Sequence, residues 1–283
     1  MINVIYAVVV LGALAIVFGA VLAVAAKKFA VEVDERQEAI LGVLPGANCG
    51  GCGFPGCSGY AAAVVKGEAA TNCCAAGGSE VASQIAGIMG VEAQDTERSV
   101  ALVKCSGFTG LAQKKFDYSG ITDCVAAMRL GGGLGPNECP HGCLGFGTCV
   151  AACPFDAIHI RDGVARVDHE KCVGCMACAA ACPKHIIVKV PYNAGITVAC
   201  SSVQKGAVLR KYCDIGCLGC KICEKTCEHD AIHVVDNLAV IDYGKCTSCG
   251  MCVAKCPRHL IRDSRLNTEG EGPIPPAVSR YAD

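Results

Sequence analysis

The most apolar part of the chain is its beginning. No side chain from residue 2 to residue 26 is charged, and Lys27 and Lys28 follow directly. At about 1.5 Å per residue, a helix over this run is long enough to cross a bilayer. A signal peptide would carry its basic residues before a shorter apolar run. The pattern predicts a single N-terminal transmembrane helix over residues 1–28, with the rest of the chain in the cytoplasm because the lysines lie on that side.

Later apolar positions form short periodic runs. Residues 29–44 carry mixed charge and are interpreted as a linker with at most a short helix. Residues 79–89 follow a helical period behind Ser79, a favourable N-cap residue, which predicts an amphipathic helix. Residues 264–283 contain three prolines and are expected to be disordered.

Two β-hairpins are expected in the second half of the chain. In the first, residues 157–160 and 164–167 flank a turn that contains Asp-Gly, a strong hairpin signal. In the second, residues 231–235 and 238–241 flank Asp236 and Asn237. Both hairpins lie between runs of cysteine.

The hairpins belong to an internal repeat of 74 residues. The motif Asp-Ala-Ile-His occurs at residues 156–159 and again at residues 230–233. Eight cysteines of the first copy coincide with eight of the second without a gap: Cys139, Cys143, Cys149, Cys153, Cys172, Cys175, Cys178 and Cys182 fall on Cys213, Cys217, Cys223, Cys227, Cys246, Cys249, Cys252 and Cys256. The chain therefore contains two copies of one module.

The cysteine spacing within the modules indicates iron–sulfur chemistry. The second copy has two runs of the form C-x2-C-x2-C-x3-C, in which three cysteines wrap one [4Fe-4S] cube and the fourth ligates a second cube. Two such runs around a hairpin are the pattern of a two-cluster ferredoxin. The crossed ligation predicts three sets: Cys217, Cys220, Cys223 and Cys256; Cys246, Cys249, Cys252 and Cys227; and Cys172, Cys175, Cys178 and Cys153.

The fourth set departs from this rule. Phe146 stands where the repeat requires a cysteine, so that Cys143, Cys149 and Cys182 remain. Either this cluster has three protein ligands, or a cysteine outside the motif supplies the fourth, and Cys139 is the nearest in sequence.

Four further cysteines suggest a sixth cluster. Cys105 and Cys200 each end a β-prone run in Cys-Ser, while Cys124 and Cys213 each follow a basic stretch. We expect Cys105, Cys124, Cys200 and Cys213 to hold a cluster that joins the two modules, although an exchange between Cys139 and Cys213 stays open. The alternative is that these cysteines are small buried hydrophobic residues, which leaves five clusters.

An earlier cysteine motif precedes both modules. Cys49, Cys52, Cys57 and Cys74 have the spacing C-x2-C-x4-C-x16-C, with glycines that let the backbone approach a cluster closely. A helix that starts just after Cys57 would place partial positive charge beside an anionic cluster. Because C-x2-C pairs also bind zinc, a zinc site is the competing interpretation.

At this point the chain resembles a known family. The uncharged run ending in Lys-Lys-Phe-Ala-Val-Glu-Val-Asp, the segment Leu-Pro-Gly-Ala-Asn-Cys-Gly-Gly-Cys-Gly-Phe-Pro-Gly-Cys and the later Asn-Cys-Cys resemble the B subunit of the Rnf complex, an ion-translocating ferredoxin:NAD⁺ oxidoreductase related to Rsx. The resemblance implies that Cys49, Cys52, Cys57 and Cys74 ligate one [4Fe-4S] cluster. Cys73 is then left over.

Composition agrees with a chain built around clusters. Its 283 residues include 25 cysteines but no Trp, and only 5 % are aromatic. Clusters are therefore expected to supply much of the folding free energy. The net charge of −1 gives no reason to expect a nucleic-acid partner. No phosphate loop or dinucleotide fingerprint is present, so no nucleotide site and no catalytic residue is assigned.

These patterns define the expected fold class and domains. We predict an α+β protein with an N-terminal transmembrane helix, a small four-cysteine Fe–S domain and two tandem ferredoxin-like modules. The expected segments are an anchor (1–28), a linker (29–44), the four-cysteine domain (45–92), a connecting region (93–138), the first module (139–192), a second connecting region (193–216), the second module (217–263) and a tail (264–283).

The expected function is electron transfer by a membrane-anchored subunit with six [4Fe-4S] clusters. The family resemblance implies a soluble ferredoxin as electron donor, other membrane subunits as acceptors and NAD⁺ reduction elsewhere, on the cytoplasmic side of the inner membrane. It also implies that this chain alone holds no complete active site. Three alternatives stay open: a subunit of another membrane oxidoreductase such as a hydrogenase or redox-sensor reductase, a zinc scaffold, and a secreted disulfide protein.

Overall fold

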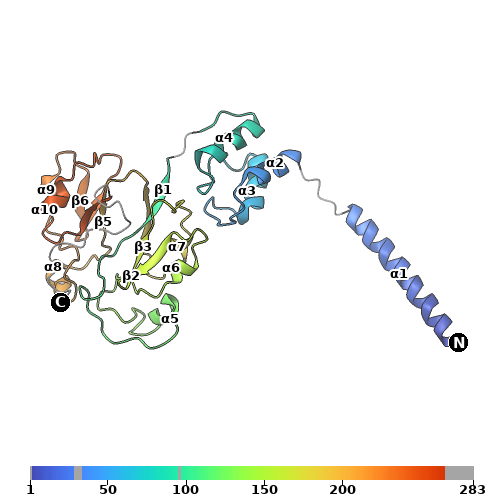
Figure 1. Cartoon of the computed structure of the whole chain (residues 1–283), viewed down its shortest axis with the longest axis horizontal. Coiled ribbons are helices and arrows are strands. Elements are labelled where there is room, and N and C mark those ends of the chain that lie inside the picture. The colour runs from blue at the N-terminus through green and yellow to red at the C-terminus, as the bar shows by residue number, and fades with distance from the viewer. Residues whose placement is uncertain (1, 29–33, 95–96, 265–283) are drawn as a thin grey trace.

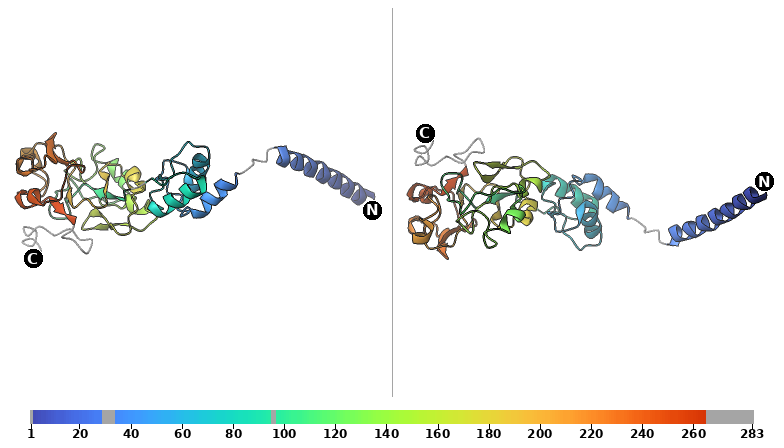
Figure 2. Two further views of the ribbon diagram at one scale, coloured as in Figure 1. Left: turned by 90° about the horizontal axis from the view of Figure 1, so that it is seen from above. Right: turned by 90° about the horizontal axis from the view of Figure 1, so that it is seen from below.

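The computed structural model describes residues 2–28, 34–94 and 97–264 (Figure 1). The expected disorder of the tail falls almost wholly on residues 265–283, outside the described residues. The first helix, α1 (Ile2–Lys28), stands apart from the other elements in all views (Figures 1 and 2).

The predicted transmembrane anchor requires a correction. In the described part of the chain, no helix combines the length and the apolar character needed to cross a membrane. By this criterion the prediction of a transmembrane helix is wrong.

The four-cysteine domain is helical. It contains α2 (Glu35–Val43), α3 (Gly56–Val65) and α4 (Gly78–Met89), so helices occur near Cys57 and over residues 79–89 as expected. The expected N-cap is wrong, because Gly77 takes this position and Ser79 lies inside α4. Asp34 caps α2 by accepting a hydrogen bond from the Arg36 backbone. The three helices enclose a small core of their own: Ile40, Leu44, Tyr60, Ala61, Val64 and Ile85. This domain therefore needs neither module to bury its apolar side chains.

The first module adds a short sheet and a hairpin. β1 (Ser99–Val103) pairs antiparallel with β4 (Ile187–Pro191), and β2 (Ile158–Arg161) pairs antiparallel with β3 (Val164–Val167), as the turn signal predicts. Its helices are short: α5 (Cys124–Met128), α6 (Thr148–Ala151) and α7 (Ala177–Ala181). Because β1 comes from the segment before the repeat, this connecting segment supplies a strand of the module.

The second module repeats this arrangement. β5 (Ile196–Val198) pairs with β8 (Ile261–Asp263), and the second expected hairpin is formed by β6 (Ile232–Val235) and β7 (Leu238–Ile241). Its helices are α8 (Gly206–Leu209), α9 (Ile222–Thr226) and α10 (Met251–Lys255). Both modules share one core, which explains why they lie side by side beyond the α2–α4 domain (Figure 2).

Candidate metal centres

In the helical domain, one loop and one later turn bring four thiols together. Burial raises the pKa of Cys74, and the nearby thiols of Cys49, Cys57 and Cys52 raise it further. Asn48 shapes the loop, because its Oδ1 accepts a 2.9 Å hydrogen bond from the Cys57 backbone at the start of α3. The set of four that the family resemblance implies is thus gathered in one place.

Cys73 lies next to this set without joining it. Its backbone N–H donates to the hydroxyl of Tyr60 at 3.2 Å, and that hydroxyl donates to the Ala70 carbonyl at 2.8 Å. Tyr60 is 1 % exposed. The tyrosine therefore holds the turn from which Cys74 reaches the other three thiols.

One ferredoxin-type set of the first module is gathered around a small cavity. The cavity is lined by Cys153, Cys172, Cys175 and Cys178, the four residues that the crossed-ligand rule selects. Backbone N–H groups donate to two of the sulfurs, from Ala101 to Cys172 at 3.4 Å and from Ala157 to Cys153 at 3.5 Å. Such donors stabilise a thiolate, the form that binds iron.

Both sets of the second module are gathered in the same way. One cavity is lined by Cys227, Cys246, Cys249 and Cys252, and Ala231 N–H donates to the Cys227 sulfur at 3.4 Å. In the other set, burial raises the pKa of Cys223 to about 11, and the nearby thiols of Cys217, Cys256 and Cys220 raise it further. Cys220 and Cys249 are exposed, so this module has thiols at its surface.

The set beside Phe146 is completed by Cys124. Cys124 lines one cavity together with Cys143, Cys149 and Cys182. Burial raises the pKa of Cys149 to about 12, and the nearby thiols of Cys143, Cys124 and Cys182 contribute to this increase. The sequence leaves the fourth ligand of this set open and offers Cys139 as a candidate; the structure brings Cys124 to it.

A local hydrogen-bond network fixes Cys124 in this place. Asp123 caps α5 through the backbone of Ala126 at 2.8 Å and accepts a 2.8 Å hydrogen bond from the Thr148 hydroxyl. The same hydroxyl accepts the Cys124 backbone N–H at 2.7 Å. Because Thr148 opens the helix that carries Cys149, the two cysteines are tied together. Phe146 instead packs on Tyr118, with 4.8 Å between ring centroids.

Cys139 lies in a different cavity, between the two modules. We call this the central cavity; its cysteines are Cys105, Cys139, Cys200 and Cys213. A Cβ added at Gly107 would lie 3.8 Å from the sulfurs of both Cys105 and Cys213, so these two sulfurs face one point. Burial raises the pKa of Cys105 to about 11 and that of Cys139 to about 12. Relative to the sets expected from sequence, Cys124 and Cys139 have exchanged places.

Contacts link neighbouring cysteine sets from the helical domain to the second module. Gly51, beside Cys52, lies so near the first module that an added Cβ would be 2.9 Å from the Cα of Cys175. Cys178 is a charged neighbour of Cys149 in the next set. The central cavity then connects to both modules through backbone-to-sulfur hydrogen bonds, from Cys143 to Cys105 at 3.4 Å and from Cys217 to Cys200 at 3.5 Å.

The donor chemistry of these sets fits iron–sulfur clusters. Across residues 2–28, 34–94 and 97–264, no group of three His, Cys, Asp or Glu side chains is arranged to hold a metal ion. The cysteines instead occur in fours, with short glycine-containing loops and N–H donors around them, as cubane clusters require. Two buried donors without a hydrogen-bond partner in the described residues, Tyr212 Oη and Arg258 Nε, also lie beside the central cavity.

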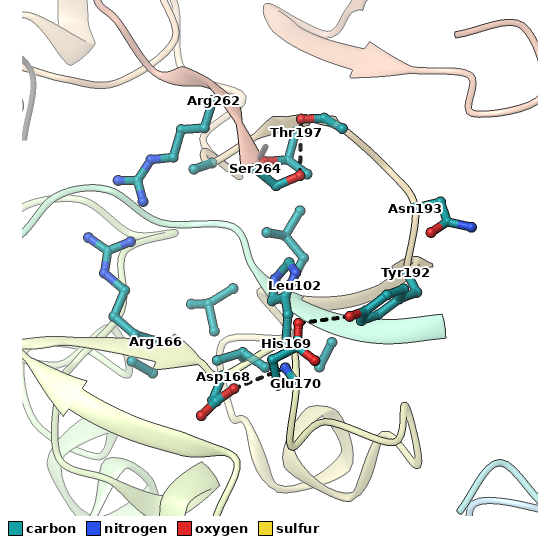
Figure 3. A pocket seen from close by; sticks show the side chains of 16 residues that line it. Leu102, Arg166, Asp168, His169, Glu170, Tyr192, Asn193, Thr197, Arg262 and Ser264 are labelled. Atoms are coloured by element: carbon teal, nitrogen blue, oxygen red, sulfur yellow. Dashed lines mark hydrogen bonds between the residues drawn. The ribbon is translucent and has the colours of Figure 1, made fainter. Parts of the chain in front are cut away.

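A larger cavity of about 610 Å³ contains no cysteine in its lining (Figure 3). Tyr192 donates to Glu170 across it at 2.8 Å. Arg166 of β3 and Arg262 of β8 reach the same end of the cavity (Figure 3). Burial lowers the pKa of Arg262 to about 10, and Cys105 is among the charged neighbours of both arginines. These two arginines therefore add positive charge near Cys105 of the central cavity.

Comparison with protein families matches three parts of the chain. Residues 44–75 match the model described as "Putative Fe-S cluster", and residues 138–186 and 216–265 each match a model described as "4Fe-4S dicluster domain". Cys105, Cys124, Cys200 and Cys213 lie outside all three matches.

Comparison with characterised proteins covers most of the chain. The B subunit of the Na⁺-translocating ferredoxin:NAD⁺ oxidoreductase complex of Acetobacterium woodii is 46 % identical over 253 residues, 89 % of this chain and 75 % of its own length. The B subunit of the proton-translocating complex of Clostridium ljungdahlii is 46 % identical over 264 residues, 92 % of each chain. The B subunit of the ion-translocating oxidoreductase complex of Methanosarcina acetivorans is 40 % identical over 253 residues, 89 % of this chain and 95 % of its own length.

The fold, the cysteine sets and these similarities define an iron–sulfur electron-transfer protein with ferredoxin-type dicluster domains. It acts as one subunit of an oxidoreductase complex. Specifically, the chain belongs to the family of B subunits of ion-translocating ferredoxin:NAD⁺ oxidoreductase complexes, as its resemblance to Rnf indicates.

Proposed function

We propose that this chain carries six [4Fe-4S] clusters and conveys electrons from soluble ferredoxin to the other subunits of its complex. Each cluster would supply a one-electron carrier. Four of the ligand sets follow the family and ferredoxin patterns. The other two are Cys124, Cys143, Cys149 and Cys182, and Cys105, Cys139, Cys200 and Cys213.

The observation that carries this proposal is the central cavity. Without it, the two modules would present two separate pairs of sites. With it, backbone N–H groups of Cys143 and Cys217 donate to sulfurs of Cys105 and Cys200, one from each module. We infer that the six sets lie in one row whose middle is buried, since all four central cysteines are at most 8 % exposed.

The surface of the second module supports a site for an external redox partner. Cys220 and Cys249 are exposed, whereas Cys175 of the first module lies against Gly51. Electron exchange with another protein requires close approach, so we place the ferredoxin contact at the second module. Names of the relatives include ferredoxin and ion translocation. On this basis we also propose that partner subunits hold the chain at the cytoplasmic face of the membrane.

Two measurements on the anaerobically purified full chain test the proposal. Iron and acid-labile sulfide should each approach about 24 per chain, since each [4Fe-4S] cluster contains four of each. A value near 20 of each would leave the central cavity without a cluster. In stopped-flow mixing, reduced ferredoxin should be oxidised as the absorbance of the chain bleaches. No reaction with ferredoxin would overturn the assigned donor while leaving the cluster count intact.

A further inference from the structure

Several cations lie around the central cavity. Lys104 lines it. Lys104 is a charged neighbour of Cys200 and also of Cys217. Arg166 is a charged neighbour of Cys105 and of Cys143, and Arg262 is a charged neighbour of Cys105. Cations therefore approach this site from β3, from β8 and from the segment after β1.

The 74-residue repeat supplies two more cations. Lys184 and Arg258 occupy equivalent positions, each following Cys-Pro. The Lys184 ammonium donates to the carbonyls of Leu134 at 2.6 Å and Pro140 at 2.9 Å, which holds it near both Cys139 and Cys182, and it lines the cavity of the Cys182 set. Arg258 donates through Nη2 to the carbonyl of Cys213. Each module thus places one cation against the central cysteine that it contributes.

Two donors beside this cavity lack an acceptor. Among the described residues, Tyr212 Oη and Arg258 Nε are the buried side-chain polar atoms without a hydrogen-bond partner. Ser202 is a polar neighbour of Tyr212 that lowers its pKa, but it does not accept a hydrogen bond from the Tyr212 hydroxyl. An unmade buried hydrogen bond costs about 1–3 kcal/mol, so an acceptor is expected at this place. The sulfurs of a bound cluster are acceptors of the right kind.

We propose that Tyr212 and Arg258 raise the reduction potential of the central cluster above those of the other five, and that Lys184 raises it together with that of the neighbouring Cys182 set. This inference rests on the proposed function, which assigns a cluster to that cavity. Reduction adds one electron, and thus one negative charge, to the cluster and its thiolates. Nearby cations and hydrogen-bond donors stabilise that charge, whereas no lysine or arginine among the described residues lines the cavities of the two outer sets that contain Cys178 and Cys252.

The test is a redox titration of the full chain followed by EPR, with a dithionite-mediator mixture as reductant. The Cys200→Ser variant identifies the central component, because it should lose that component and about four irons per chain. Cys139→Ser serves the same purpose if Cys200→Ser does not fold. If neither variant loses a component, the cluster assignment fails, irrespective of any effect on potential.

Tyr212→Phe removes one hydroxyl without changing charge or shape, and Arg258→Gln and Lys184→Gln each remove a cation. Each should shift the reduction equilibrium of the central component at least about tenfold toward the oxidised form, or about 59 mV for one electron. Arg258→Lys should restore part of the shift. Tyr192→Phe, at the cysteine-free cavity, is the matched control and should leave every potential unchanged. Wild-type potentials in Tyr212→Phe and Arg258→Gln would overturn the inference, and equal shifts in Arg258→Lys and Arg258→Gln would assign Arg258 a structural role.

Discussion

The backbone N–H of Cys143 donates a 3.4 Å hydrogen bond to the sulfur of Cys105. The two residues belong to different cysteine sets, so the bond joins one site to the next. The repeat reproduces it, since Cys217 donates to Cys200 at 3.5 Å. The central cavity is therefore reached from both modules through equivalent contacts. This relationship depends on which cysteines share a set, and it can be tested directly.

The exchange of Cys124 and Cys139 predicts which pairs of cysteine substitutions lose iron additively. Cys124→Ser/Cys149→Ser affects one set and should remove about four irons per chain, as either single variant does. Cys124→Ser/Cys139→Ser affects two sets and should remove about eight. Iron quantitation on anaerobically purified protein gives the answer. If Cys124→Ser/Cys200→Ser removes four irons and Cys124→Ser/Cys149→Ser removes eight, Cys124 belongs to the central set after all.

Phe146 offers a rescue of the same site. The repeat aligns it with Cys220, the position at which a ferredoxin module normally carries a ligand. Cys124→Ser should lose about four irons, and Cys124→Ser/Phe146→Cys should recover them. The single variant Phe146→Ala is the control for lost packing on Tyr118, which is worth about 0.5–1.5 kcal/mol, and it should keep all its iron. Failure of the double variant to recover iron would show that the loop no longer directs residue 146 toward the cluster.

Tyr60 is expected to stabilise the helical domain through its hydroxyl. Tyr60→Phe leaves the Ala70 carbonyl and the Cys73 N–H without their buried partner, and should reduce the free energy of unfolding by about 1–3 kcal/mol. Burial raises the pKa of Tyr60 to about 12, so the hydroxyl is intact at neutral pH. Anaerobic denaturant titration measures the change. An unaltered unfolding midpoint would show that water replaces the hydroxyl.

The sequence predicts local structure better than it predicts the assignment of ligands. Turn chemistry and helical period locate both hairpins and α4, because these depend on residues close in sequence. The spacing rule selects three ferredoxin sets whose members the structure gathers. The partner of Cys149 could not be found in this way, because Cys124 reaches it over 25 positions through the Asp123–Thr148 contact. The N-cap pattern Asp-Cys-Val-Ala-Ala-Met was a usable signal for α5, but not for its docking site.

His169 should make stability depend on pH in the mildly acidic range. Burial lowers its pKa and nearby Arg98 lowers it further, although Asp168 and Glu170 act in the opposite direction. The unfolded chain therefore binds a proton more readily than the folded one, and stability is lost as pH falls below the unfolded value of about 6.5. His169→Asn should show a smaller loss between pH 7.5 and pH 5.5 in anaerobic denaturant titrations. If the free energy of unfolding fell by the same amount in both proteins over this pH range, the expectation would be contradicted.

Gly51 is expected to control the approach of the helical domain to the first module. An added Cβ would lie 2.9 Å from both the Cα and the Cβ of Cys175, closer than non-bonded carbons pack, so Gly51→Ala must push the two parts apart. The magnetic interaction between the reduced clusters on either side should weaken, which narrows their EPR lines, while the iron content stays unchanged. Gly87→Ala is the matched control, because Gly87 lies inside α4 with open space around it. There alanine should stabilise the helix by up to about 1 kcal/mol and leave the EPR spectrum as in the wild type. An identical spectrum for Gly51→Ala would mean that the contact does not set the distance between these two clusters.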